Sequence, residues 1–198
     1  TPLALVEEQV GGDSYYTLEL DNRVFFPVKS GTFIVSPFGV DIIDRRIYHV
    51  NADQKNIKVI PLPNKNRPIS FTGLVGDFDF EVELSNKEAE LNEVITLQVT
   101  ITGEGNLHHA IAPELNLPDE VELYADPVET KEYEIGTNGF KGELNYTYPL
   151  KVVKKSRAEL PKINFSYFDP EKKRYITHAS QSFLINDHTD TTDIELIQ

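Results

Sequence analysis

The sequence contains no cysteine, and this absence removes several classes of site at once. A chain without thiols has no disulfide framework, no thiolate nucleophile and no cysteine-ligated zinc or iron–sulfur centre. Methionine is absent as well, and the chain begins with Thr1-Pro2, so we expect it to be a segment excised from a longer polypeptide.

Long apolar runs and basic residues are also scarce. No run is long enough to cross a bilayer and no basic-then-apolar signal segment opens the chain, so we expect a soluble segment. The 19 basic residues face 32 acidic ones, which gives a net charge of −13. Such a charge repels phosphate groups over most of a protein surface. We therefore expect neither a nucleic-acid partner nor binding to an anionic membrane surface.

What the sequence does contain is strict alternation of apolar and polar residues, the pattern of a half-buried β-strand. It is clearest over residues 77–84, where the apolar side chains fall on one face and the acids on the other. The same period returns over residues 95–101 and 144–152. No comparable stretch has the period of a helix, and residues 85–92 are predicted to form a connecting turn.

Short strands separated by Gly, Asn, Asp and Pro at intervals of about ten residues are typical of antiparallel β-sandwiches. The proline-rich stretch 60–68 is the natural linker between two such units, because proline cannot donate to a sheet ladder. We therefore predict an all-β protein with two domains that meet near residue 64.

A weak internal repeat relates the two domains. Lys29-Ser30 recurs 126 positions later as Lys155-Ser156, and the offset persists in the following strands. We predict that residues 1–63 form the C-terminal half of one sandwich, 64–188 a complete sandwich, and 189–198 a polar tail. A half-sandwich exposes an edge and an apolar face, so it should pair with its neighbour or with another copy.

The stretch TGEGNLHH, residues 102–109, suggests two kinds of site. A phosphate-binding loop requires a third glycine and a following helix, and the sequence has neither. A metal site requires ring nitrogens that converge, whereas His108 and His109 would point to opposite faces of an extended strand. We therefore predict no cofactor and no metal here, and we expect the glycines to supply positive φ at a bulge or turn.

The many acidic residues show no arrangement that is typical of a catalytic site. Asp77 and Asp79 alternate along one strand and are interpreted as part of a solvated face. The segment Asp187–Asp193 clusters carboxylates that suit calcium, and a polar, mobile tail is the competing interpretation. No carboxylate pair and no Gly-x-Ser-x-Gly elbow indicates a hydrolase, so no catalytic residue is predicted.

The late aromatic residues have two interpretations. Phe165, Tyr167, Phe168 and Tyr175 would form a sugar-stacking platform if exposed, or fill the sandwich core if buried. Their burial therefore separates a carbohydrate-binding module from a protein-interaction module.

Several motifs, in this order, resemble the periplasmic region of the BatD proteins of the Bacteroides aerotolerance operon. They are PVKSGTFIV (27–35), PLP (61–63), FTGLVGDF (71–78), ITGEGNL (101–107) and LPKINFSYFDP (160–170) with Tyr175, and together they span roughly residues 24–185. One departure is Lys155-Ser156-Arg157, which stands where many relatives have a glycine turn.

The resemblance implies a membrane-anchored envelope protein with tandem immunoglobulin-like β-sandwiches and a link to oxygen tolerance. Its partners would be the von Willebrand A-type and tetratricopeptide-repeat proteins of the same operon, which also encodes a MoxR-type ATPase. We predict a non-enzymatic, periplasmic protein-interaction module; the alternative is a carbohydrate- or peptidoglycan-binding module, and an envelope hydrolase is a third, weaker hypothesis. Exposed strand edges also offer a route to self-association. The predicted partner-binding loop comprises Gly103, Glu104, Gly105, Asn106, Leu107, His108 and His109.

Overall fold

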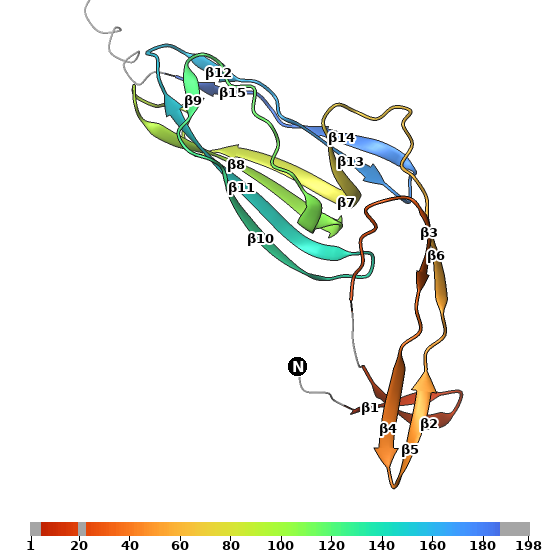
Figure 1. Cartoon of the computed structure of the whole chain (residues 1–198). Helices are drawn as coiled ribbons and strands as arrows, with labels where there is room; N and C mark the ends of the chain where they lie inside the picture. The colour runs from red at the N-terminus through yellow and green to blue at the C-terminus, as the bar shows by residue number, and fades with distance from the viewer. Residues whose placement is uncertain (1–4, 20–22, 187–198) are drawn as a thin grey trace, which may run out of the picture.

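The computed structural model describes residues 5–19 and 23–186, and its regular structure is almost entirely β-strand (Figure 1). The one helical element in these ranges is a 3₁₀ turn, η1, at Leu107–His109. The prediction of an all-β protein is therefore confirmed. The calcium hypothesis for Asp187–Asp193 and the predicted tail 189–198 lie outside the described residues.

Seven strands after the linker form one continuous sheet in the order β10-β11-β8-β7-β13-β14, and the short β9 also pairs with β11. The strands are β7 Phe71–Leu84, β8 Val94–Gly105, β9 Val121–Leu123, β10 Val128–Ile135, β11 Phe140–Val152, β13 Asn164–Asp169 and β14 Arg174–Ala179. Two shorter strands, β12 Ala158–Leu160 and β15 Phe183–Ile185, form a separate pair. The strands predicted from alternation all lie within these bounds.

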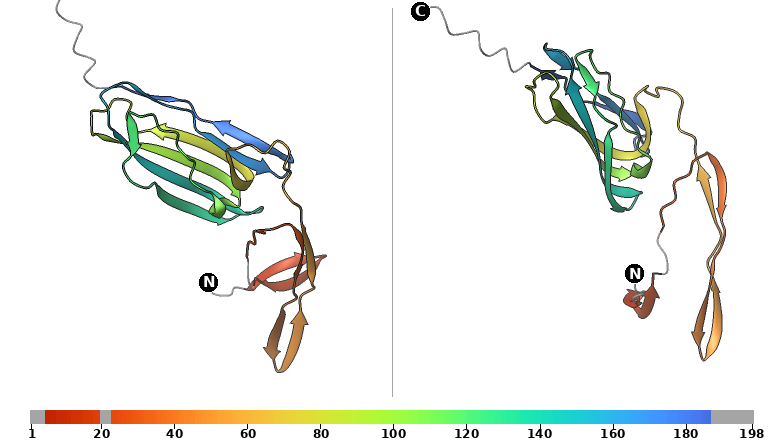
Figure 2. Two further views of the ribbon diagram at one scale, coloured as in Figure 1. Left: turned by 45° about the horizontal axis from the view of Figure 1, so that its top comes forward. Right: turned by 60° about the vertical axis from the view of Figure 1, so that its left-hand side comes forward.

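Strand β7 belongs to both halves of this sheet. Its first residues, Phe71 to Val75, run parallel to β13, whereas residues 76–84 pair antiparallel with β8. Gly73 and Gly76 lie where the strand changes partner, with φ of 85° and 154° that favour glycine. The sheet thereby curls into two layers, with β13 and β14 in one and β8, β10 and β11 in the other (Figure 2).

One hydrophobic core fills the space between the layers. In β11 the buried side chains recur at every second position, as the alternation predicts: Leu144, Tyr146, Tyr148, Leu150 and Val152. They form a single cluster with apolar residues of β8, β12, β13 and β15. Burial of apolar surface between the layers is therefore what holds the sandwich together.

The connections also agree with their predictions. Residues 85–92 contain no helix, and the backbone N–H of Thr96 donates a 2.9 Å hydrogen bond to Oγ of Ser85, which fixes the start of this connection. Residues 60–70 contain no strand, as expected of the proline-rich linker.

The residues before the linker form three separate strand pairs. They are β1 Leu5–Val10 with β2 Asp13–Leu18, β3 Gly31–Val35 with β6 Lys55–Val59, and β4 Gly39–Asp44 with β5 Arg46–Asn51. The pairs lie in two hairpins, because β3 and β6 flank the hairpin β4–β5. Among residues 5–19, 23–43 and 45–73, no side chain is buried. The division into an incomplete sandwich over 1–63 and a complete immunoglobulin-like sandwich over 64–188 stays a prediction.

Candidate functional site

The predicted loop lies at the end of the sandwich that faces the N-terminal hairpins. Strands β7, β8 and β11 meet there through glycines: Gly105 lies opposite Gly76, and Gly103 lies opposite Gly142. The φ angles of Gly103 and Gly105 are 146° and 155°, which confirms the expectation of positive φ. Both residues lie inside β8, however, and the chain turns only after them, at Asn106.

These glycines allow the ring of Phe78 to lie directly on the backbone of β8. A Cβ atom on Gly103 would stand 2.2 Å from the carbonyl oxygen of Asp77 and 2.9 Å from the Phe78 ring. A Cβ atom on Gly105 would stand 2.2 Å from the carbonyl oxygen of Val75 and 2.7 Å from the same ring. Because protein interiors are close-packed, no side chain fits at either position. The role of the glycines is therefore the close approach of strands.

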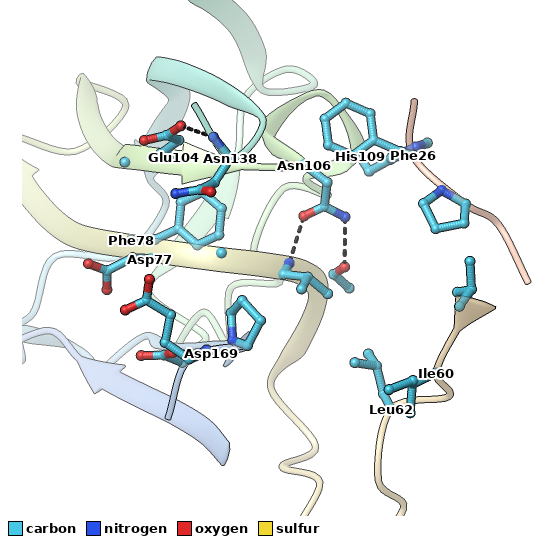
Figure 3. A pocket seen from close by; sticks show the side chains of 18 of the residues that line it. Phe26, Ile60, Leu62, Asp77, Phe78, Glu104, Asn106, His109, Asn138 and Asp169 are labelled. Carbon is cyan, nitrogen blue, oxygen red and sulfur yellow. Dashed lines mark hydrogen bonds between the residues drawn. The ribbon is translucent and has the colours of Figure 1, made fainter. Parts of the chain in front are cut away.

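Asn106 fastens the turn to β7. Its side-chain Oδ1 accepts a 2.6 Å hydrogen bond from the backbone N–H of Val75, and its Nδ2 donates a 3.2 Å bond to the carbonyl oxygen of Gly73 (Figure 3). Its own backbone N–H donates to the carbonyl oxygen of Val75 at 3.2 Å. One amide side chain thus satisfies a backbone donor and a backbone acceptor of β7, and it sets the position of the loop.

We expect Asn106→Ala to lower the free energy of unfolding by about 2 kcal/mol, because a partly buried backbone N–H loses its acceptor. The measurement is urea denaturation followed by tyrosine fluorescence. The matched control is Asn116→Ala at an exposed position, for which a change within about 0.5 kcal/mol is expected. Equal effects of the two substitutions would contradict the role assigned to Asn106.

The two histidines pack against each other and against the N-terminal part of the chain. The expectation that their rings point to opposite faces of a strand is wrong, because Leu107–His109 form a 3₁₀ turn. The ring centroids of His108 and His109 are 3.8 Å apart, and Phe26 lies 4.4 Å from His108. Burial lowers the pKa of His108, and the charges of His109 and Lys131 lower it further. No group of three potential metal ligands occurs in the described part of the chain.

A cleft of about 1020 Å³ opens between this end of the sandwich and the N-terminal hairpins (Figure 3). One wall consists of residues 26–30 and 59–62, and the other consists of the glycine-containing strands, the turn and the β13–β14 connection. Acidic side chains outnumber basic ones in its lining, which includes Asp77, Asp79, Glu104, Asp169, Glu171, Lys29, Lys141 and Lys172. The cleft therefore combines apolar surface with charges of both signs, of which the negative ones are in excess.

The structure divides the predicted loop into supporting and accessible residues. Gly105 and Leu107 are buried, so they support the turn from inside. Glu104, Asn106 and His109 line the cleft, and His109 is the most accessible of the three. These three are therefore the side chains of the loop that are accessible from the cleft.

Asp169, at the end of β13, is a buried carboxylate in the same wall of the cleft as the loop. Its Oδ1 accepts hydrogen bonds from the backbone N–H groups of Glu171 and Lys172 at 2.9 and 2.8 Å, and its Oδ2 pairs with Nζ of Lys172 at 2.6 Å. Burial alone would raise the pKa of Asp169, but the bonds from Lys172 and Glu171 outweigh it and hold that pKa below its ordinary value of 3.8. These hydrogen bonds connect the end of β13 to residues of the β13–β14 turn and thereby stabilise its conformation.

We expect Asp169→Asn to destabilise the sandwich by about 2 kcal/mol at neutral pH, because hydrogen bonds to a charged group are lost. A lowered folded-state pKa means that the stabilisation is complete well above pH 3.8 and disappears as the pH falls through the folded-state value. The difference between wild type and variant, measured by urea denaturation across pH, should therefore shrink on acidification. Glu171→Gln, the control at an exposed neighbour, should show no such difference.

Comparison with known protein families shows which family the chain belongs to. The model of a family described as "BatD DUF11 like domain" matches residues 82–186, which is more than half of the sequence. The chain belongs to the BatD family. No curated protein and no solved structure gives a significant match.

The family match covers most of the sandwich, from the second half of β7 to β15. BatD proteins are membrane-anchored proteins of the cell envelope, and the BatD match relates this chain to the aerotolerance operon. In the described part of this BatD chain, no helix has the length and apolar character needed to span a membrane.

Burial decides between the two interpretations of the late aromatic residues in this BatD sandwich. Phe165, Tyr167 and Phe168 are buried, so the core interpretation is confirmed for these three. Tyr175 is half-buried, and its hydroxyl donates a 2.9 Å hydrogen bond to the carbonyl oxygen of Pro63 in the linker. These four rings therefore do not form an exposed platform for a sugar.

Sequence reasoning missed three residues of the BatD cleft. Phe26 joins the site only because the chain folds back on itself over some eighty residues, and no local pattern indicates this contact with His108. Asn138, whose N–H donates to Oε1 of Glu104, sits in the turn Gly136–Gly139, where the glycines were a usable signal. Asp169 precedes Pro170, a turn signal that also predicts an Asp side chain bonded to the backbone.

Proposed function

We propose that this BatD segment is a non-enzymatic protein-interaction module on the periplasmic side of the membrane, in a protein that contributes to oxygen tolerance. Its partners are the von Willebrand A-type and tetratricopeptide-repeat proteins of the Bat operon. The contact surface is the cleft, with Glu104, Asn106 and His109 of the loop on one wall.

The BatD match is the observation that carries this proposal, and the geometry of the loop supports it. A rigid sandwich that positions a variable loop is a common arrangement for binding. Here a partner seated in the cleft would contact the loop together with the segments just before β3 and at the end of β6, because residues of all three line the cleft. The lining charges would then orient the partner and exclude surfaces of the wrong charge pattern. The carbohydrate-binding alternative requires exposed aromatic rings, and of the four rings named for it three are buried and Tyr175 is half-buried.

The test is chemical crosslinking and affinity purification of the full-length protein from its native membrane. The double variant Lys29→Glu/His109→Glu changes two accessible residues of the cleft and should reduce recovery of the operon partners about tenfold or more. The matched control, Lys155→Glu, alters an exposed residue just after the end of β11 that lies away from the cleft, and it should leave recovery unchanged. Failure to recover any operon partner would overturn the partnership, and unchanged recovery with the double variant would overturn the site.

A further inference from the structure

The first hairpin of the chain repeats a hairpin of the sandwich in register. Strands β1 and β2 pair with Leu5 opposite Leu18, and β10 and β11 pair with Lys131 opposite Leu144. Both residues of the second pair lie 126 positions further along the chain than those of the first (131 against 5, and 144 against 18). The sheet pairing thus reproduces the offset found in the sequence.

The other two strand pairs of the N-terminal unit repeat the end of the sandwich in the same way. The pair β4–β5 runs from Gly39 opposite Asn51 to Asp44 opposite Arg46, and the pair β13–β14 runs from Asn164 opposite Ala179 to Asp169 opposite Arg174. Likewise, β3 pairs with β6 as β12 pairs with β15. Strand β13 lies 125 positions after β4, and β14 lies 128 positions after β5. The offset differs between the two because one residue connects β4 to β5, whereas four residues connect β13 to β14.

The repeat shows which strands the N-terminal unit lacks. In the sandwich, β8 covers the edge of β11 that faces away from β10, and the start of β7 covers the edge of β13 that faces away from β14. The equivalent edges belong to β2 and β4, and neither has a strand beside it within residues 5–19 and 23–186. Open edges of this kind present unpaired backbone N–H and C=O groups.

Apolar side chains next to these edges are exposed, whereas their equivalents in the sandwich are buried. Leu18 is 37% exposed, whereas its equivalent Leu144 is 1% exposed. Ile42 is 52% exposed, whereas its equivalent Tyr167 is 3% exposed. The face that is core in one unit is therefore uncovered in the other.

We propose that the N-terminal hairpins are the acceptor site for a β-hairpin whose two strands have the pattern of β7 and β8. Those strands contain 14 and 12 residues, and they alternate buried and accessible side chains. One strand of the occupant pairs antiparallel with β2 and the other runs parallel to β4, so that its apolar side chains cover Leu18 and Ile42. A strand pair fits better than a flat surface, because only strands supply hydrogen bonds to both open edges while filling the space between them. This site is separate from the cleft and does not depend on the partners proposed for it.

The experiment places a photo-crosslinking amino acid in the full-length protein within its native envelope. It is introduced at position 42 or 18 on the uncovered face, and at position 56 as the control. Asn56 is next to the apolar Ile57 in β6, so alternation along the strand places its polar side chain on the face opposite to that of Ile57. We expect crosslinks from positions 42 and 18 in at least tenfold higher yield than from 56, with both mapping by mass spectrometry to the two strands of one hairpin.

The mapped segment identifies the polypeptide that supplies the hairpin. Crosslinks to lipid, to a helical segment or to the same face of a second copy would overturn the proposal, and so would equal yields at all three positions. A second variant keeps the test independent of folding: Ile42→Asp should reduce crosslinking from position 18 at least tenfold. Hydrogen exchange in β8 and β11 should stay unchanged in that variant, because the sandwich has its own core.

Discussion

Gly103→Ala should lower the free energy of unfolding by about 4 kcal/mol, a loss that combines overpacking with backbone strain. The added Cβ would meet the carbonyl oxygen of Asp77 at 2.2 Å and the ring of Phe78 at 2.9 Å. The residue would also have to keep a φ of 146°, which L-residues rarely adopt. The measurement is urea denaturation followed by tyrosine fluorescence, for which the chain provides nine tyrosines and no tryptophan.

Gly73→Ala is the matched control, because it separates strain from packing. Gly73 has a φ of 85°, but a Cβ added to it would have no atom within 4 Å, so the substitution keeps the strain and removes the clash. We expect a loss of about 1–2 kcal/mol from strain alone. Equal losses for the two substitutions would contradict the packing of Phe78 on the glycine backbone.

Phe165→Ala should also lower the free energy of unfolding by about 4 kcal/mol, because it opens a cavity in the core. The Phe165 side chain is fully buried and stacks on Phe80, with ring centroids 5.1 Å apart and an interplanar angle of 12°. The substitution therefore removes a contact between the two layers as well as apolar surface. Urea denaturation measures the loss.

Phe25→Ala is the control for this prediction, since Phe25 is 77% exposed. It should change the free energy of unfolding by no more than about 0.5 kcal/mol. If Phe165→Ala were as mild as this control, Phe165 would have to be exposed in solution, and the carbohydrate-binding alternative would regain its platform.

The fold of the sandwich follows from sequence patterns that are local. Alternation over residues 77–84, 95–101 and 144–152 identifies the three longest strands, because a strand with one buried face must place an apolar side chain at every second position. The same logic accounts for the irregular connection at 85–92 and for the proline-rich linker. These features depend only on residues that are adjacent along the chain.

The site depends on residues that are distant along the chain, and for that reason much of it escaped prediction. The pattern of β8 alone does not reveal that Gly103 and Gly105 lie inside a sheet, since the strands on both sides determine how closely the backbone must pack. The histidine pair was misjudged because three residues of 3₁₀ turn replace the expected extended chain. The cleft itself requires the linker to bring Phe26 beside His108. The internal repeat was visible in the sequence, but only strand pairing fixes its register.

The passage of β7 from one layer to the other has a mechanical consequence. Tension transmitted through the linker would pull β7 along its own length, while hydrogen bonds hold it to β13 over its first part and to β8 over the remainder. Ladder bonds of an antiparallel pair lie across the strand direction. Such a pull loads many of them together in shear, whereas a pull across the strands would break them one after another. The first strand of the sandwich is thus placed to resist force between the N-terminal hairpins and the sandwich.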